Sequence, residues 1–322
     1  MKKTFLVSIC IPVHNTEKLL PCCLESVAEQ KLDGLELVLI NDQSSGKDEQ
    51  GRNCKKIVRA FEKKSKIPVV YVVHNQYVPL LETRRELVEQ AHGQYILMVD
   101  SDDLLAPGAV QTLYEAAKSK GADITCAQER VYRINEGKIE TSDFHYASFS
   151  DGELLGREVL DSWIIRSETS AFLWAKLIKR ELYLTAFNAI PYMDCSLSVD
   201  TVIYFFIAYY AKSYYGINDV VYYYLTNEGI TNNKPISDLK KWRRHCTVAS
   251  VFTLLLTFDG NLTKDEKEGI RKISRSLMKY SILRLREQVI PELRTEAREM
   301  LCEFWGKDYV ETVEKFIDEA NK

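Results

Sequence analysis

Residues 95–103 read YILMVDSDD, five apolar residues followed by a serine among three carboxylates. An apolar run of this length predicts a strand, and similar β-rich runs precede it. Stretches with helical periodicity separate these runs. The strand-like runs lie at 6–13, 35–40, 69–73 and 95–99, and the helical stretches at 19–30, 55–64 and 80–91, with another after Pro107. Because parallel strands need such crossovers, the alternation predicts an α/β fold, a mostly parallel sheet flanked by helices.

The rest of the chain changes character in two steps. A further strand is expected at 124–128, and residues 131–141 look like a hairpin that turns at Asn135-Glu136-Gly137. From residue 237 onward the pattern is helical and highly charged. We therefore predict one α/β domain over residues 1–235 and a helical C-terminal region over residues 236–322.

The composition is that of an ordinary globular protein. Of the 322 residues, 46% are hydrophobic and 28% are charged, which excludes a disordered chain. A net charge of -3 provides no positive field for nucleic acid, so no nucleic-acid partner is expected. The eight cysteines form no CxxC pair, which favours reduced thiols over a zinc site or a disulfide framework.

The location expected for the chain is the cytoplasm. Residues 5–13 are too few for the apolar core of a signal peptide, and no small-residue cleavage site follows them. The longest aromatic-aliphatic stretch, 202–211, is about half as long as a helix that spans a bilayer. We interpret this stretch as a buried helix.

Polar residues follow three of the predicted strands. They are His14-Asn15-Thr16 after the first strand, residues 41–45 after the second, and Asp100-Ser101-Asp102-Asp103 after the fourth. In parallel sheets ligands bind beyond the carboxyl ends of the strands, so these three segments are expected to meet at one edge. Crowded carboxylates repel one another unless a cation neutralises them, and oxygen ligands favour Mg²⁺ or Mn²⁺ shared with substrate phosphates. The alternative is a group of helix N-cap residues, since Asp is favoured there.

These segments carry a resemblance to a known family. Residues 7–15, 37–45, 93–96 and 100–103, together with Arg84, resemble in order and spacing the N-terminal signature of family-2 glycosyltransferases. The similarity covers residues 4 to about 130, and residues 174–180 resemble the family's Trp-x-Lys-Leu-x-x-Arg segment. The resemblance implies the GT-A fold, which is Rossmann-like, with a nucleotide-binding half at 1–130 and an acceptor half at 131–235.

The resemblance also implies an activity. A relative of this kind moves a hexosyl or N-acetylhexosaminyl group, with inversion, from a nucleotide-diphosphate sugar to a hydroxyl of a glycan or lipid-linked oligosaccharide. The expected nucleotide is UDP, and the expected setting is bacterial surface polysaccharide synthesis, in the cytoplasm or at the inner face of the membrane. The alternative is a non-catalytic nucleotide-binding relative or a partner subunit of a glycan assembly complex.

The family roles transfer to named positions of this sequence. Pro12 and Asn15 would border the nucleotide, and Asp42 would accept a hydrogen bond from the base. Asp100 would face the ribose, with Ser101 beside it among the nucleotide-binding residues. Asp102 would bind Mn²⁺ or Mg²⁺, and Arg84 would lie near the diphosphate, with its neighbour Arg85 pointing elsewhere on the helix. A metal and an arginine both stabilise the charge that builds on a departing nucleoside diphosphate.

The acceptor side is predicted from position in the family pattern. Asp200 is the candidate general base, and Asp194 is the alternate. The other interpretation of Asp200 is a residue that stabilises the start of a helix after Ser198. Trp174 is either part of a sugar-stacking platform or a core residue. The basic run 240–245 is either a peripheral membrane contact or a solvated helix face.

Two departures from the family pattern keep the non-catalytic alternative open. Asn41 stands where many relatives have Asp, and Val199 stands where they have Glu. A dinucleotide-binding oxidoreductase fits less well, because it needs Gly-x-Gly after the first strand and this chain has none there.

Overall fold

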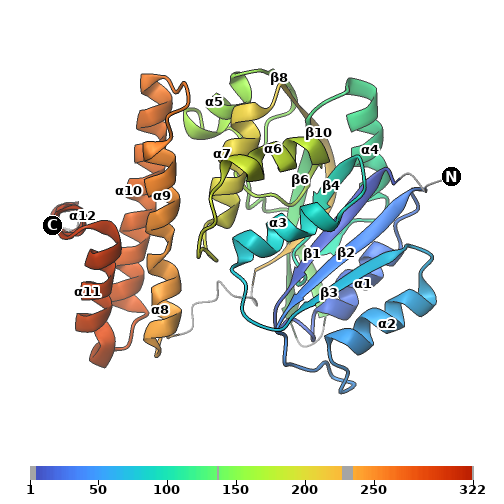
Figure 1. The fold of residues 1–322 in the computed structure, drawn as a ribbon, viewed down its shortest axis with the longest axis horizontal. Coiled ribbons are helices and arrows are strands. Elements are labelled where there is room, and N and C mark those ends of the chain that lie inside the picture. Colours follow the sequence, from blue (N-terminus) through green and yellow to red (C-terminus); the bar gives the residue numbers. More distant parts are fainter. Residues whose placement is uncertain (1–4, 136–137, 227–234, 321–322) are drawn as a thin grey trace. The chain divides into compact units, whose positions relative to one another are not determined.

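The computed structural model describes residues 5–135, 138–226 and 235–320 (Figure 1). The chain forms two compact units. The sheet unit comprises Met1–Tyr192 and Ile203–Ile230, and the helical unit comprises Met193–Val202 and Thr231–Lys322. The predicted boundary after residue 235 lies close to this division, whereas the sequence pattern did not indicate that Met193–Val202 belongs with the helical unit.

The first half of the sheet unit confirms the predicted alternation. Four parallel strands lie side by side in the order β3-β2-β1-β4, and a helix follows each strand. The strands are β1 (Val7–Val13), β2 (Leu35–Asp42), β3 (Val69–His74) and β4 (Tyr95–Met98), and the helices are α1 (Leu20–Ala28), α2 (Cys54–Lys64), α3 (Leu80–Gln90) and α4 (Ala109–Lys120). The polar segments after β1, β2 and β4 therefore share one edge of the sheet.

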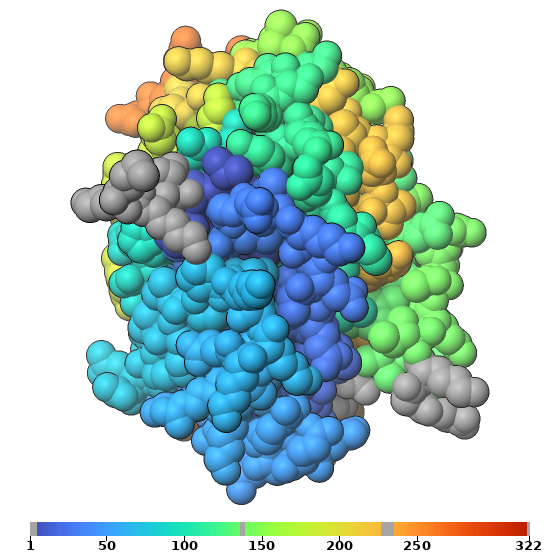
Figure 2. Space-filling model, turned by 90° about the vertical axis from the view of Figure 1, so that its right-hand side faces the viewer, coloured from blue at the N-terminus to red at the C-terminus, as the bar shows by residue number. Residues whose placement is uncertain are grey.

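Strand β1 shows how the sheet is covered on both faces. Val7, Ile9 and Ile11 belong to the core that the sheet forms with α1, α2 and α4. The alternate residue Cys10 faces the other side, where its thiol donates to the Leu87 carbonyl of α3 at 3.8 Å. A strand buried on both faces is mostly apolar along its whole length, and β1 fits this pattern with Ser8 as its one polar residue. Figure 2 shows the outer surface of α1 and α2 in blue beside that of α4 in green.

The second half of the sheet contains both parallel and antiparallel pairs. The order continues β4-β9-β6-β10-β5, and β9 runs antiparallel to both of its neighbours. The strand expected at 124–128 continues unbroken to the end of β6, which then pairs with β7 as a hairpin whose residues 136–137 lie outside the described residues. The strands are β5 (Leu104–Leu105), β6 (Ile124–Asn135), β7 (Lys138–Ser142), β8 (Gly152–Leu155), β9 (Lys176–Lys179) and β10 (Ser213–Leu225).

Three more helices lie between β8 and β10, and the last of them, α7, begins in the helical unit and continues in the sheet unit. They are α5 (Glu158–Ile164), α6 (Arg180–Ala189) and α7 (Val199–Tyr210). Helix α7 confirms the buried helix expected at 202–211, since Ile203, Phe205 and Phe206 are fully buried.

The helical unit has a core of its own, as the change of pattern after residue 237 predicted. Its helices are α8 (Leu239–Cys246), α9 (Val248–Thr257), α10 (Lys264–Glu287), the 3₁₀ turn η1 (Pro291–Leu293), α11 (Arg294–Trp305) and α12 (Lys307–Ala320). Trp242 is fully buried in this core, and its indole N–H donates to the Ala297 carbonyl at 2.7 Å. Thr263 and Glu266 form a reciprocal capping box that fixes the start of α10. None of the helices that the structure describes is long and apolar enough to cross a bilayer.

Candidate active site

The loops after β1 and β2 are tied to each other at the carboxyl edge of the sheet. The Asn15 backbone N–H donates to Ser44 Oγ at 3.0 Å, and the Asn15 side-chain oxygen accepts from the Ser45 N–H at 3.0 Å. His14 Nδ1 lies 2.6 Å from the Asp42 carbonyl oxygen. Asn15 has φ +54°, a conformation that Asn tolerates better than most residues. Asn15 therefore holds the two loops at the edge where the nucleotide is expected.

Pro12 lies in the last part of β1, where a proline costs little. Its partner in the register with β2 is Ile40, and the pairing of β1 with β4 ends earlier, at Cys10. The missing N–H of Pro12 therefore removes no bond to β4. The predicted contact of Pro12 with a nucleotide stays a prediction.

Asp42 is held by two groups that the sequence analysis missed. Its Oδ1 accepts from the Val78 N–H at 3.2 Å and lies 3.1 Å from His74 Nδ1. The other ring nitrogen of His74 lies 2.9 Å from Glu86 Oε2. The His74 ring therefore bridges the carboxyl groups of Asp42 and Glu86. His74 ends β3 at the same sheet edge, so the strand-end rule applied to β3 would have found it.

Arg84 and Asp100, predicted as separate contacts to the donor, are brought together. Arg84 belongs to α3, is 4% exposed, and donates from Nη2 to Asp100 Oδ1 at 2.9 Å. Arg85 points away, as expected, and donates to backbone carbonyls at the end of α6, including Ile190 O at 2.9 Å. Beside Asp100, the Ser101 hydroxyl lies 2.8 Å from Thr16 Oγ1 and so ties the segment after β4 to the segment after β1.

Asp103, the last carboxylate of the acidic segment, anchors the tip of β4. Its two oxygens accept from the Tyr222 hydroxyl and the Leu225 N–H, each at 2.8 Å, and the residue is 1% exposed. The Tyr222 oxygen also accepts from the Asp100 N–H at 3.0 Å. Burial and the nearby charge of Asp102 raise the pKa of Asp103 well above its usual range. Asp103 is thus a structural residue that joins the acidic segment to β10.

The surroundings of Asp102 disfavour its ionised form, and a bound cation would stabilise that form. Burial, and after it the charge of Asp100, raises the pKa of the Asp102 carboxyl to about 6. A cation would relieve both effects, and a set of one or two carboxylates suits Mg²⁺ or Mn²⁺ when substrate phosphates supply further oxygens. Among the described residues no group of three or more His, Cys, Asp or Glu side chains is arranged to hold an ion without such help. The residues therefore fit a metal that arrives with a diphosphate.

Trp174 belongs to the core and forms no sugar platform. It is 3% exposed, and its ring stacks on Tyr222 and Tyr224 with centroids 5.3 and 5.4 Å apart. Lys176 is buried as well and donates to the Phe172 carbonyl at 2.6 Å, while burial lowers the pKa of its ammonium group. The Trp-x-Lys segment therefore supports the sheet behind the acidic segment.

The acceptor-side candidates lie in the helical unit. Asp200 stands in the first turn of α7, and Ser198 just before it has φ +55°. The alternate Asp194 forms an exposed ion pair with Arg243, 3.2 Å from carboxylate to guanidinium. The role of Asp200 as general base stays a prediction.

Comparison with known proteins agrees with this geometry. The family model described as "Glycosyl transferase family 2" matches residues 8–191. Among curated proteins, the chain is 27% identical over 183 residues to glycosyltransferase GlyG of Streptococcus pneumoniae, which covers 55% of this chain and 58% of that protein. It is 25% identical over 180 residues to glycosyltransferase GlyA of the same organism, 55% of this chain and 25% of that protein. The chain thus spans less than two thirds of the length of these relatives.

Two solved structures share the fold over nearly the whole chain. Residues 1–349 of S. aureus TarS in complex with UDP-GlcNAc superpose with a TM-score of 0.61 at 17% identity, covering 98% of this chain and 92% of that one. The mannosyltransferase PcManGT from Pyrobaculum calidifontis, in complex with GDP-Man and Mn²⁺, superposes with a TM-score of 0.57 at 13% identity, covering 97% and 86%. At these identities the likeness establishes the fold.

Proposed function

Because the chain belongs to glycosyl transferase family 2, we propose that it transfers a sugar, with inversion, from a nucleotide-diphosphate sugar to a hydroxyl of a glycan or lipid-linked oligosaccharide. The observation that supports this proposal is that Asp42, which ends β2, and Asp100 and Asp102, which follow β4, share one edge of the sheet, with Arg84 bonded to Asp100. The donor is UDP-linked and the group moved is a hexosyl or N-acetylhexosaminyl group, used in bacterial surface polysaccharide synthesis.

Asp42 is proposed to recognise the base. Its Oδ1 takes the contacts with His74 and Val78, so Oδ2 is the oxygen that accepts from a nucleobase N–H. A carboxylate fixed in this way rejects a base that presents an acceptor at the same point, because the buried oxygen would then stay unpaired.

The diphosphate is proposed to lie between Asp102 and Arg84. Asp102 would hold Mn²⁺ or Mg²⁺, which would supply positive charge for the departing nucleoside diphosphate. Arg84 contributes a second positive charge that is already desolvated and held by Asp100, so little reorganisation accompanies the reaction.

Asp200 is proposed to remove the proton from the acceptor hydroxyl. Inversion requires this base to act on the side of the sugar carbon opposite the diphosphate. The first turn of α7 stabilises the ionised carboxylate that a base needs.

The proposed location is the cytoplasm, with peripheral contact to the inner face of the membrane. Lys240, Lys241 and Arg244 of α8 are exposed, and such a group attracts anionic lipid headgroups. Flotation with anionic vesicles tests the contact, and a chain that stays unbound at low salt contradicts it.

A transfer assay separates the enzyme from the alternative, a non-catalytic nucleotide-binding relative or partner subunit. Asn41, one of the two departures that motivate the alternative, is 6% exposed and donates to the Tyr71 hydroxyl at 3.2 Å. Release of nucleoside diphosphate from UDP-sugars with Mn²⁺ and glycan acceptors is the readout. Turnover that Asp102→Ala abolishes and the exposed control Asp33→Asn retains supports the enzyme. Nucleotide binding without turnover supports the alternative.

A further inference from the structure

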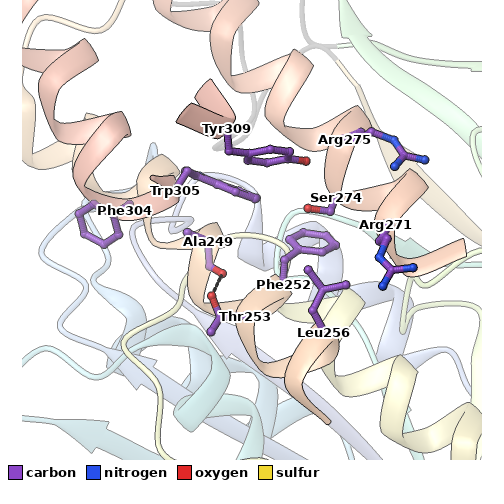
Figure 3. Close-up of a pocket in the computed structure, with 10 residues that line it drawn as sticks. All are labelled: Ala249, Phe252, Thr253, Leu256, Arg271, Ser274, Arg275, Phe304, Trp305 and Tyr309. Carbon is purple, nitrogen blue, oxygen red and sulfur yellow. Dashed lines mark hydrogen bonds between the residues drawn. The ribbon is translucent and has the colours of Figure 1, made fainter. Parts of the chain in front are cut away.

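The helical unit contains a cavity of about 290 Å³ (Figure 3). Its walls come from α9, from the middle of α10, and from the turn between α11 and α12. All of its lining residues belong to the helical unit, and they include Phe252, Arg271, Arg275, Trp305 and Tyr309.

One side of the cavity is a wall of three neighbouring aromatic rings. The Phe252 and Trp305 rings are 5.9 Å apart and 27° from parallel, and the Trp305 and Tyr309 rings are 6.1 Å apart and 31° from parallel. The Trp305 indole Nε1 is buried and has no hydrogen-bond partner among the described residues. The Nε1 atom is closed to solvent, so the wall presents apolar ring surface to the cavity.

The rim of the cavity is positively charged. Arg271 and Arg275 lie one turn apart on α10, and their side chains are 54% and 52% exposed. Both guanidinium groups share the single carboxylate of Glu268, at 3.5 and 2.6 Å. Exposed ion pairs of this kind are weak, so an anionic ligand that offers several oxygens can compete for the two arginines.

We propose that this cavity binds one anionic sugar, a hexose that carries a phosphate or a carboxylate, as part of the acceptor glycan. The sugar ring lies against the aromatic wall, and the anionic group lies between Arg271 and Arg275. The volume is at the lower end of small-molecule sites, about 300 Å³, which suits one sugar and excludes a nucleotide sugar. The assignment to an acceptor rests on the proposed function, whereas the binding itself does not.

The test is a fluorescence titration of the full chain, because Trp305 lies in the proposed site. The probes are glucose 1-phosphate, N-acetylglucosamine 1-phosphate and glucuronate, with glucose, inorganic phosphate and decanoate for comparison. We expect saturable binding of at least one anionic sugar with a Kd near about 1 mM. Arg271→Gln with Arg275→Gln should weaken it at least about tenfold, since charge-assisted bonds are lost. The matched control, Lys272→Gln with Lys279→Gln, removes the same charge from α10 outside the cavity and should leave the Kd unchanged.

Each other outcome overturns the proposal. The first is that no anionic sugar saturates the signal up to about 50 mM, and the second is that the arginine substitutions leave the Kd of the sugar unchanged. The others are that inorganic phosphate binds as tightly as the sugar phosphates, or that decanoate binds most tightly of all the probes. Trp305→Phe should abolish the fluorescence change and shows whether the signal comes from this wall. Stabilisation by Mn²⁺ with a nucleoside diphosphate, measured on the same variants, should be unchanged. If the chain binds the sugars but no nucleotide, the proposed function is wrong, and the proposal that the cavity binds an anionic sugar still holds.

Discussion

Replacing Asp102 with Asn should make the metal-free protein more stable at neutral pH while destroying its metal site. Burial and the neighbouring charge of Asp100 raise the pKa of the Asp102 carboxyl from its ordinary 3.8 to about 6. Below 3.8 the folded and unfolded chains both hold the proton, so the carboxyl costs nothing. Between 3.8 and 6 the folded chain holds a proton that the unfolded chain has released, and stability falls as the pH rises. Above pH 6 both chains are ionised at this group, and the unfolding free energy stays lower by the full amount.

The size of the effect follows from the same numbers. A change from 3.8 to about 6 corresponds to about 3 kcal/mol of unfolding free energy. Asn is neutral at every pH, so the Asp102→Asn chain should gain up to about 3 kcal/mol near pH 8 and less than about 1 kcal/mol near pH 4. Urea unfolding with a chelator present measures this difference. Asp33→Asn, at an exposed position, is the control and should change stability little at either pH. A pH-independent gain, or no gain near pH 8, refutes the reasoning.

Three further substitutions test individual parts of the site. Tyr222→Phe removes a donor from the buried Asp103 carboxylate and should lower the unfolding free energy by about 2–3 kcal/mol in urea; a loss below about 0.5 kcal/mol contradicts the anchoring role. His74→Phe removes a contact that positions the Asp42 carboxylate, so it should weaken nucleoside diphosphate binding about tenfold in calorimetry. An unchanged Kd would disprove this positioning role of His74. Asp200→Asn should cut transfer by about 10²–10⁴-fold with nucleotide affinity unchanged, and full transfer in that variant removes the assignment.

The first four strands were predictable because each is a short, mostly apolar run followed by polar residues. Strand β10 was not, although it has 13 residues. Gly216, Asn218 and Asp219 interrupt its apolar pattern, and its register with β6 shifts in the same region. What holds β10 in the sheet is its pairing with β6, a contact between distant parts of the chain that no local pattern reveals.

The acidic segment shows a similar limit within the site. Asp102 and Asp103 are neighbours with the same side chain, and sequence alone favoured Asp102 only through family resemblance. The structure separates them by their partners, since the Tyr222 hydroxyl and the Leu225 N–H occupy Asp103. Trp174 illustrates the same point, because an indole suits both a sugar platform and a core. Its exposure of only 3% assigns it to the core.

The most direct test of the account is thermal unfolding of the full chain with Mn²⁺ and a panel of nucleoside diphosphates. A ligand that binds only the folded chain raises its stability, by about 2.7 kcal/mol at a hundred times its Kd. We expect one nucleoside diphosphate, UDP, to raise the unfolding temperature only when Mn²⁺ is present. Asp102→Ala should remove this effect, and Asp33→Asn should keep it. If no nucleotide raises the unfolding temperature, or if the rise survives in Asp102→Ala, the proposed donor site is wrong.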